Sequence, residues 1–218
     1  MARSTTPKTP AASKAASSKS STPVTTTTDH SKAQPANAPM DPTPSRPLHT
    51  PGPVGDNMAS EIAHAMNGVL ADAFTLYMKT KNFHWHMSGP HFRDYHLLLD
   101  EQATQVFEIT DDIAERVRKL GQRTLTSIGA VSHNASLGEN DAEFVAPLDM
   151  LNELCEDNRK FRAVLGKAHS VADDAGDFAT TSAIEVWMDD AERRTWFLFE
   201  TARSLGDTNS APALLTKA

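Results

Sequence analysis

One stretch of the sequence, residues 92–120, carries polar side chains that could bind a metal ion. Four of them are His96, Asp100, Asp111 and Glu115. In a helix with 100° per residue they fall within about 100° of one another, on one face. His84 lies shortly before this stretch. Imidazole nitrogen and carboxylate oxygen together suit iron, and two carboxylates four residues apart can bind one ion. The pattern therefore indicates a metal site that uses both donor types.

Each carboxylate also has a simpler interpretation. Taken singly, Asp111 or Glu115 is more often a solvated residue on a helix surface. Arg116 and Arg118 follow closely and could form ordinary ion pairs with them along the same helix. An isolated pair of carboxylates would therefore be weak evidence for a metal site. The hypothesis depends on the two histidines and three carboxylates taken together.

The elements that must position these residues are helices. Apolar residues recur three to four positions apart from about residue 57 to 86 (Ile62, Met66, Val69, Ala73, Tyr77). Ser88-Gly89-Pro90 ends this helix, and a second runs from about Phe92 to Leu120, before Gly121. Residues 121–146 are irregular, with room for one short helix. A third helix begins at Pro147 and ends before Gly176, and a fourth begins near Asp177. Four long amphipathic helices predict an all-α four-helix bundle.

The distances within such a bundle imply a site shared between two subunits. If the first two helices are antiparallel, His84 lies beside residues 94–96. Asp111 is 15 residues further along than His96, which is about 22 Å at 1.5 Å per residue. One chain therefore cannot bring His84 and Asp111 to the same ion. Two chains can, if their second helices run antiparallel about a two-fold axis.

These residues also occur in a familiar order. The run Lys81-Asn-Phe-His-Trp-His-Met-Ser-Gly-Pro-His-Phe92, then His96-Leu-Leu-Leu-Asp-Glu-Gln102 and Asp111-Asp-Ile-Ala-Glu-Arg116, resembles the Dps family (DNA-binding protein from starved cells). That family has an H-W dipeptide, then H-x3-D, then D-x-[IV]-A-E-R, and the separations of 12, 4, 11 and 4 residues match its spacing. The resemblance covers residues 57–206 and includes Trp196.

The resemblance implies a ferritin-like bundle, assembled as a dodecameric shell, with ferroxidase centres at two-fold interfaces. By position, His84 and His96 would come from one subunit, and Asp111 and Glu115 from its neighbour. Asp100 would be a ligand or a partner on the histidine side, and Trp85 would pack beside the centre. The implied enzyme oxidises Fe(II), preferably with hydrogen peroxide, and stores the ferric product as a mineral, which protects DNA from oxidative damage.

The first 56 residues differ sharply from the rest of the chain. They hold ten of the 13 prolines, six Lys or Arg and three Asp or Glu. The remainder carries a formal charge of −10, since the whole chain carries −7. We expect a disordered basic tail over residues 1–56, the bundle over 57–206 and a flexible C-terminal tail over 207–218. The basic tail residues that would hold DNA phosphates are Arg3, Lys8, Lys14, Lys19 and Lys32.

Weaker signals remain as hypotheses. Asp173, Asp174 and Asp177 lie where the Dps family places acidic residues of its iron-entry pores, although Ser182 stands where many relatives have an aspartate. Glu61-Ile-Ala-His64 has the E-x-x-H form of classical ferritins, but no second such motif occurs, so it is interpreted as a chance match. His86 and His91 are expected to be exposed turn residues. His30 and His49 are candidates for a further weak metal site.

The sequence also limits where the protein is located and which functions it can have. The single cysteine, Cys155, fits a reducing cytoplasm and a buried thiol. No apolar run is long enough for a membrane span, and no secretory signal is evident, so a cytoplasmic protein is expected. Three roles stay open: the ferroxidase described above, a structural protein that compacts the nucleoid and has a vestigial metal site, and plain iron binding without catalysis. The first two are compatible with each other.

Overall fold

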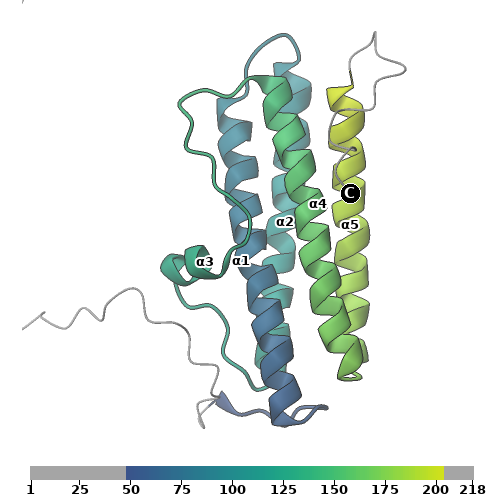
Figure 1. Ribbon diagram of the computed structural model, residues 1–218. Coiled ribbons are helices and arrows are strands. Elements are labelled where there is room, and N and C mark those ends of the chain that lie inside the picture. Colours follow the sequence, from purple (N-terminus) through teal and green to yellow (C-terminus); the bar gives the residue numbers. More distant parts are fainter. Residues whose placement is uncertain (1–47, 204–218) are drawn as a thin grey trace, which may run out of the picture. The chain divides into compact units, whose positions relative to one another are not determined.

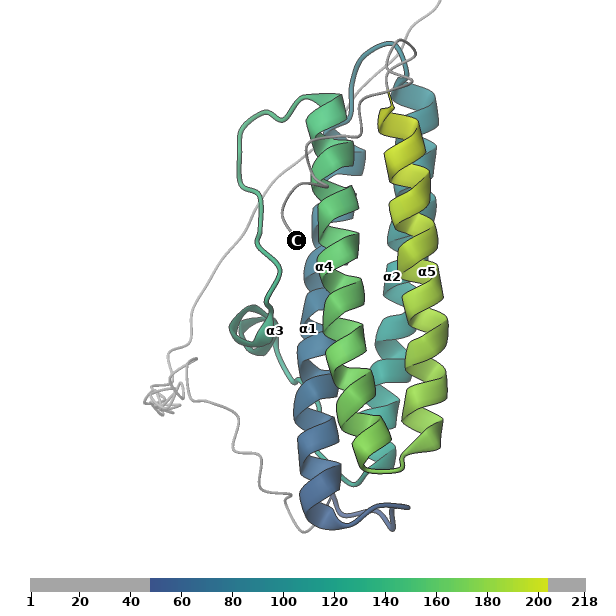
Figure 2. The ribbon, with the colours of Figure 1, turned by 45° about the vertical axis from the view of Figure 1, so that its right-hand side comes forward.

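The computed structural model describes residues 48–203. Within this part of the chain all regular structure is helical: α1 Asp56–His86, α2 Phe92–Lys119, α3 Ile128–Asn134, α4 Pro147–Asp174 and α5 Phe178–Ala202. The four long helices lie side by side (Figures 1 and 2). The fold predicted from the sequence, a four-helix bundle with one short helix in the middle connection, is confirmed.

The middle connection is long because of the helix directions. α2 and α4 run in the same direction, so residues 120–146 must cross the length of the bundle, and they do so along α1 with α3 on the outside (Figure 1). The carboxylate of Asp72, in α1, holds this connection by accepting hydrogen bonds from the backbone N–H groups of Ser136 and Leu137 at 2.6 and 2.9 Å. A short connection would have required α4 to run antiparallel to α2.

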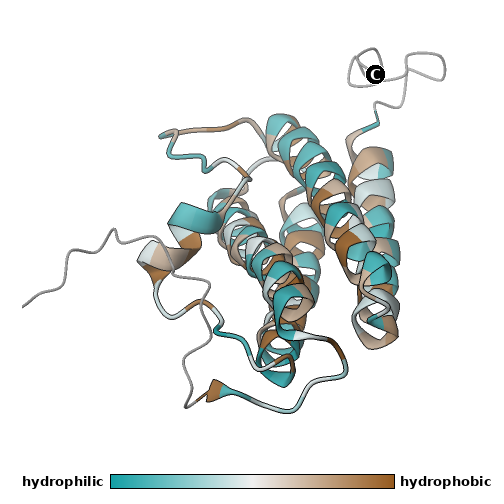
Figure 3. Ribbon diagram, turned by 60° about the horizontal axis from the view of Figure 1, so that its bottom comes forward, coloured by the Kyte–Doolittle hydropathy of each residue, from teal (hydrophilic) through white to brown (hydrophobic). Residues whose placement is uncertain are grey.

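The core follows the expected apolar stripes. Ile62, Met66 and Val69 of α1 and Leu151, Phe161 and Leu165 of α4 are fully buried. Figure 3 shows the resulting alternation of hydrophobic and hydrophilic turns along each helix. Cys155 is a buried free thiol, as expected, and burial raises its pKa. No helix between residues 48 and 203 is long and apolar enough to cross a membrane.

The helix ends are set by glycines with positive φ. Gly121 has φ +76°, and the N–H of Gln122 bonds back to the carbonyl of Val117 at 3.2 Å, which closes α2 with a Schellman turn. Gly176, with φ +70°, closes α4 in the same way. A Cβ on Gly121 would also lie 3.0 Å from the backbone nitrogen of Thr50. The segment before α1 therefore packs directly on the end of α2.

That packing involves residues that the sequence assigns to the tail. Residues 48–55 were expected to belong to the disordered tail, but Arg118 donates a hydrogen bond to the carbonyl of Leu48 at 2.9 Å and another to the carbonyl of Gln122. Leu48 and Thr50 are thus held against the end of α2. Residues 1–47 and 204–218, which include most of the expected tails, lie outside the described residues.

Buried polar groups cross the middle of the bundle. Lys79 Nζ of α1 lies 2.7 Å from the carboxylate of Asp157 and 2.9 Å from that of Glu153, both on α4. Arg194 of α5 is 2% exposed and donates to Asn158 at 2.8 Å. Burial lowers the pKa of Arg194 to about 10. The interior of the subunit therefore holds two fixed cations.

Candidate metal centre

The turn between α1 and α2 brings the two candidate histidines together. α1 ends at His86, Gly89 takes φ +97°, and the N–H of Phe92 bonds to the carbonyl of Gly89 at 3.0 Å. The chain reverses within these few residues, so the last turn of α1 lies beside the first turns of α2. His84 and His96 are neighbours as a result, as the sequence predicts.

The two imidazoles are held by each other's backbone. Nδ1 of His84 lies 2.8 Å from the carbonyl oxygen of His96, and Nδ1 of His96 lies 2.9 Å from the carbonyl oxygen of His84. The rings stack with centroids 3.7 Å apart. A carbonyl oxygen only accepts, so each Nδ1 must carry the proton. Each neutral ring therefore presents an unprotonated Nε2, the form that binds a metal ion.

A carboxylate adjoins the histidine pair. Oδ1 of Asp100 lies 3.8 Å from Nε2 of His84 and 2.7 Å from Nζ of Lys81. The hydrogen bond from Lys81 lowers the pKa of Asp100. The carboxyl group is therefore ionised at neutral pH. Lys81 was not singled out from the sequence, although its place three residues before His84, on one helical face, was the available signal.

Aromatic residues surround this cluster. Phe92 lies with its ring centroid 5.0 Å from that of His96. Trp85 follows His84 but is 56% exposed, and Lys81 Nζ is 6.0 Å from its ring centroid. Trp85 therefore stands at the surface next to the histidine pair and is not packed over it within one chain.

The other two candidate ligands lie apart from the histidines. Asp111 and Glu115 are exposed on α2, and the helical rise puts Asp111 about 22 Å from His96. Within the described residues Glu115 forms one ion pair, with Lys119 at 3.1 Å between two exposed side chains. Residues 48–203 contain no group of three or more His, Cys, Asp or Glu side chains placed to hold one ion. One chain thus presents a histidine half and a carboxylate half at two places along α2.

The ion pairs that Arg116 and Arg118 could have formed with Asp111 and Glu115 along α2 are not observed. Arg116 turns away from the carboxylates and binds Asp177 of α5 at 2.6 Å, and Arg118 binds the carbonyl of Leu48. Asp111 and Glu115 therefore keep exposed carboxylates that no arginine neutralises within the described chain.

The expected pore residues separate into two kinds. Asp177 is 2% exposed and caps α5 by accepting from the N–H and hydroxyl of Thr180. Its carboxylate is thus used inside the subunit. Asp173, Asp174 and Ser182 are exposed. A pore lined by carboxylates from this turn would have only Asp173 and Asp174 available.

The remaining candidates lie at the surface or outside the described residues. Glu61, His64, His86, His91 and His49 are exposed. His30 and the five basic tail residues Arg3, Lys8, Lys14, Lys19 and Lys32 lie outside the described residues.

The donor types suit iron, which binds both imidazole nitrogen and carboxylate oxygen. The histidine half offers two Nε2 atoms next to an ionised carboxylate, and the carboxylate half offers two more oxygens at i, i+4 spacing. Neither half alone supplies a complete coordination shell.

Comparisons with known proteins agree with this architecture. The ferritin-like domain family matches residues 63–205. A "DNA protection during starvation protein" from Agrobacterium fabrum is 34% identical over 142 residues, which cover 65% of this chain and 88% of that protein. The structure of DpsC from Streptomyces coelicolor superimposes with a TM-score of 0.69 at 25% identity, over 72% of this chain and 91% of that one. A Dps protein from Vibrio cholerae, described as a member of the ferritin-like diiron-carboxylate superfamily, superimposes with a TM-score of 0.64 at 22% identity, over 67% and 92% of the two chains.

Proposed function

The chain belongs to the Dps proteins of the ferritin-like family, and on this basis we propose that it is a cytoplasmic ferroxidase that oxidises Fe(II), stores the ferric product and so protects DNA. The ligands are His84, His96 and Asp100 of one subunit and Asp111 and Glu115 of its neighbour. The name of the Agrobacterium relative and the superfamily of the Vibrio protein support the iron-linked, protective role.

One observation carries the proposal. The reciprocal bonds between the His84 and His96 side chains and backbones fix both rings with Nε2 unprotonated. Single Nδ1–carbonyl bonds also occur at the exposed His86 and His133, so the weight lies on two such rings stacked beside Asp100. A pair that binds metal is expected to be held in this way, because hydrogen bonding at the other nitrogen sets the ligating tautomer and raises its basicity.

The exposed apolar side chains support a two-fold assembly. Met78 and Trp85 of α1 and Leu97 and Phe107 of α2 are each about half exposed. Such side chains on two adjacent helices indicate a surface that a second subunit covers. If that subunit is antiparallel, its Asp111 and Glu115 meet His84 and His96. We propose a dodecamer built from such pairs.

The preferred oxidant in the proposal is hydrogen peroxide. Two Fe(II) ions give one electron each to H₂O₂, the O–O bond breaks, and two Fe(III) and two hydroxide ions result. Because both electrons are delivered together, hydroxyl radical is not released. The protein supplies the histidine and carboxylate donors for Fe(II), orients Asp100 through its ion pair with Lys81, and offers exposed carboxylates to the ferric product.

DNA binding by the tail is a further part of the proposal. Arg3, Lys8, Lys14, Lys19 and Lys32 would contact phosphates without reading bases. Many copies on one particle would strengthen a weak contact by avidity. This role does not require the metal centre.

The test is rapid Fe(II) oxidation by stoichiometric peroxide under anaerobic conditions. His84→Ala and Asp111→Ala, singly and together, should lower the rate to that of iron without protein, while the particle mass stays that of the wild type. His91→Ala, an exposed histidine of the same turn, is the control and should keep the rate. Wild-type kinetics in the double variant would refute the assignment.

A further inference from the structure

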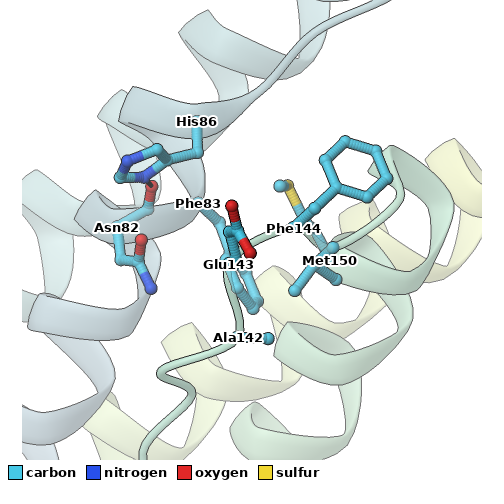
Figure 4. Close-up of a pocket in the computed structure, with 8 residues that line it drawn as sticks. Asn82, Phe83, His86, Ala142, Glu143, Phe144 and Met150 are labelled. Atoms are coloured by element: carbon cyan, nitrogen blue, oxygen red, sulfur yellow. Dashed lines mark hydrogen bonds between the residues drawn. The ribbon is translucent and has the colours of Figure 1, made fainter.

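A mostly apolar pocket of about 130 Å³ lies between the end of α1, the middle connection and the start of α4 (Figure 4). Its apolar lining comes from Phe83, Ala142, Phe144, Val145 and Met150. Phe83 and Met150 belong to the buried core, whereas Phe144 is 71% exposed. Apolar cavities of about 150 Å³ can hold a benzene molecule, so this pocket admits an aliphatic side chain.

Two polar side chains of the lining already have backbone partners. Nδ1 of His86 lies 2.8 Å from the carbonyl oxygen of Asn82, and the His86 ring points away from Glu143 (Figure 4). The side-chain amide of Asn82 donates to the carbonyl oxygen of Asn140 at 3.1 Å. Glu143 is exposed and is the one acidic residue of the lining. The pocket therefore offers apolar surface next to a single carboxylate.

The end of α5 lies beside the start of α4, which forms one wall of the pocket. Across this antiparallel helix pair, Sγ of Cys155 lies 3.7 Å from the carbonyl oxygen of Thr195. Ala202 is seven residues after Thr195, and Leu148 is seven residues before Cys155. Ala202 is therefore about level with Leu148 and close to the level of Met150, because both helices rise equally per residue. Figure 1 shows α4 beginning and α5 ending at the same end of the bundle.

The chain that follows α5 contains apolar residues of a suitable size. Residues 204–218 lie outside the described residues, and their sequence includes the adjacent Leu214 and Leu215. Leu214 is eleven residues beyond Arg203, a stretch that spans up to about 36 Å when extended. Packed helices are only about 10 Å apart. Lys217 follows shortly after and is opposite in charge to Glu143. The length, side chains and charge of this segment thus match the pocket.

We propose that residues 211–215 dock in the pocket of their own chain and insert the side chain of Leu214 or Leu215 beside Phe144 and Met150. Insertion covers the exposed ring of Phe144 and removes apolar surface from water. A tethered segment has an advantage over a separate molecule, because a short flexible linker gives an effective concentration in the millimolar range. The docked segment holds the middle connection against α1 and α4. The inference goes beyond the ferroxidase and does not depend on it.

Disulfide trapping in the full-length, assembled protein tests the docking. Phe144→Cys is combined with Leu214→Cys or with Leu215→Cys, and the proteins are oxidised. Cys155 does not compete, because it is buried and its raised pKa disfavours the reactive thiolate. We expect at least one pair to give a closed monomer that migrates faster on a non-reducing gel. Ile128→Cys, at an exposed apolar position of the same connection, is the control and should give no such band with either partner.

Two trapping results would overturn the inference. A covalent dimer would show that the segment docks on a neighbouring chain, and the absence of a disulfide in both pairs would show that it does not dock at Phe144.

Amide exchange gives an independent measurement. The N–H of Ala142 donates to Oδ1 of Asn140 at 3.0 Å, so its exchange rate reports how firmly the connection is held. Leu214→Asp/Leu215→Asp should raise this rate about tenfold, the factor expected for the loss of one buried leucine side chain. Phe144→Ser should have a similar effect, and combining the substitutions should add little more. Ile128→Ser should leave the rate unchanged. Wild-type exchange in the leucine variant would contradict the docking, whatever the rate of Fe(II) oxidation.

Discussion

Arg116 follows Glu115 directly, yet its guanidinium lies 2.6 Å from the carboxylate of Asp177 on α5 and bonds Thr180 at 2.7 Å. Burial alone would raise the pKa of Asp177, but the hydrogen bonds from Arg116 and Thr180 outweigh it and hold this pKa below its usual range. The pair joins the end of α2 to the start of α5, which have few other contacts.

The first prediction concerns this pair and pH. Because the folded pKa of Asp177 is lowered, its contribution to stability is fully present above the unfolded value near 3.8 and is lost as pH falls below it. Asp177→Asn should cost about 2–3 kcal/mol at pH 7, and the difference from wild type should shrink as the pH falls below about 4. Melting temperatures across this range test it. Asp173→Asn, at an exposed position of the same turn, should change the melting temperature little. If the difference between Asp177→Asn and wild type does not depend on pH, the assignment is contradicted.

The second prediction tests whether the centre is shared between subunits. His84→Ala and Asp111→Ala proteins are each expected to be inactive. If they are unfolded and refolded together in equal amounts, about half of the pairs contain one of each, and such a pair has one intact and one doubly defective site. About a quarter of wild-type activity should return. A site within one chain would give no recovery on mixing.

The third prediction concerns Lys79. Hydrogen bonds from the Lys79 ammonium to Asp157 and Glu153 outweigh its desolvation and raise its pKa, so it stays charged inside the bundle. Lys79→Met leaves Glu153 and Asp157 without their shared buried cation, although Lys160 remains 3.7 Å from Asp157, and should cost about 3–5 kcal/mol. Adding Glu153→Gln and Asp157→Asn should recover much of this loss. Lys167→Met, at the surface of α4, is the matched control. Thermal melting of the wild type, the single variant, the triple variant and the control measures these differences. Equal losses of stability in the single and triple variants would contradict the pairing.

The fourth prediction compares two glycines. Gly121→Ala introduces a Cβ at φ +76° and 3.0 Å from the Thr50 backbone, so it should destabilise the protein by about 1–3 kcal/mol and loosen residues 48–50. Gly68 is inside α1 with open space around it, so Gly68→Ala should stabilise by up to about 1 kcal/mol. Denaturant unfolding and amide exchange at Thr50 measure both effects. Equal changes at the two positions would contradict the strain assigned to Gly121.

The fifth prediction concerns the tail. Deleting residues 1–47 keeps the contact between Leu48 and Arg118 and should leave the particle intact. The truncated protein should no longer retard DNA at low salt but should oxidise Fe(II) at the wild-type rate. Undiminished retardation would place the DNA contacts on the body of the particle.

The sequence predicted the helices well because their ends are marked by residues with restricted backbones. Pro147 begins α4, and Gly121 and Gly176 end α2 and α4, where left-handed φ values are required. The proximity of His84 and His96 follows from the tight turn between two long helices. These features depend on local geometry, which a sequence encodes directly.

Side-chain partners between distant helices were not predictable in the same way. An ion pair of Arg116 along its own helix was the simpler alternative for Asp111 and Glu115, but Arg116 binds Asp177, 61 residues away. Lys79 and Arg194 were not identified as core residues from the sequence, because each is a single charged residue in an otherwise regular apolar pattern. Both are buried in the structure. Which charged residue meets which depends on how whole helices are rotated, and periodicity does not specify this. Whether Asp111 and Glu115 meet His84 stays a prediction, because it concerns a second subunit.

The buried Lys79 has one more consequence. Many metalloproteins reach their native fold only when the ion arrives, since their inward carboxylates need a counter-charge. Here that counter-charge is covalently part of the chain, between Glu153 and Asp157. The described bundle therefore needs no metal ion to neutralise these two carboxylates, and we expect a chelator to leave its fold intact.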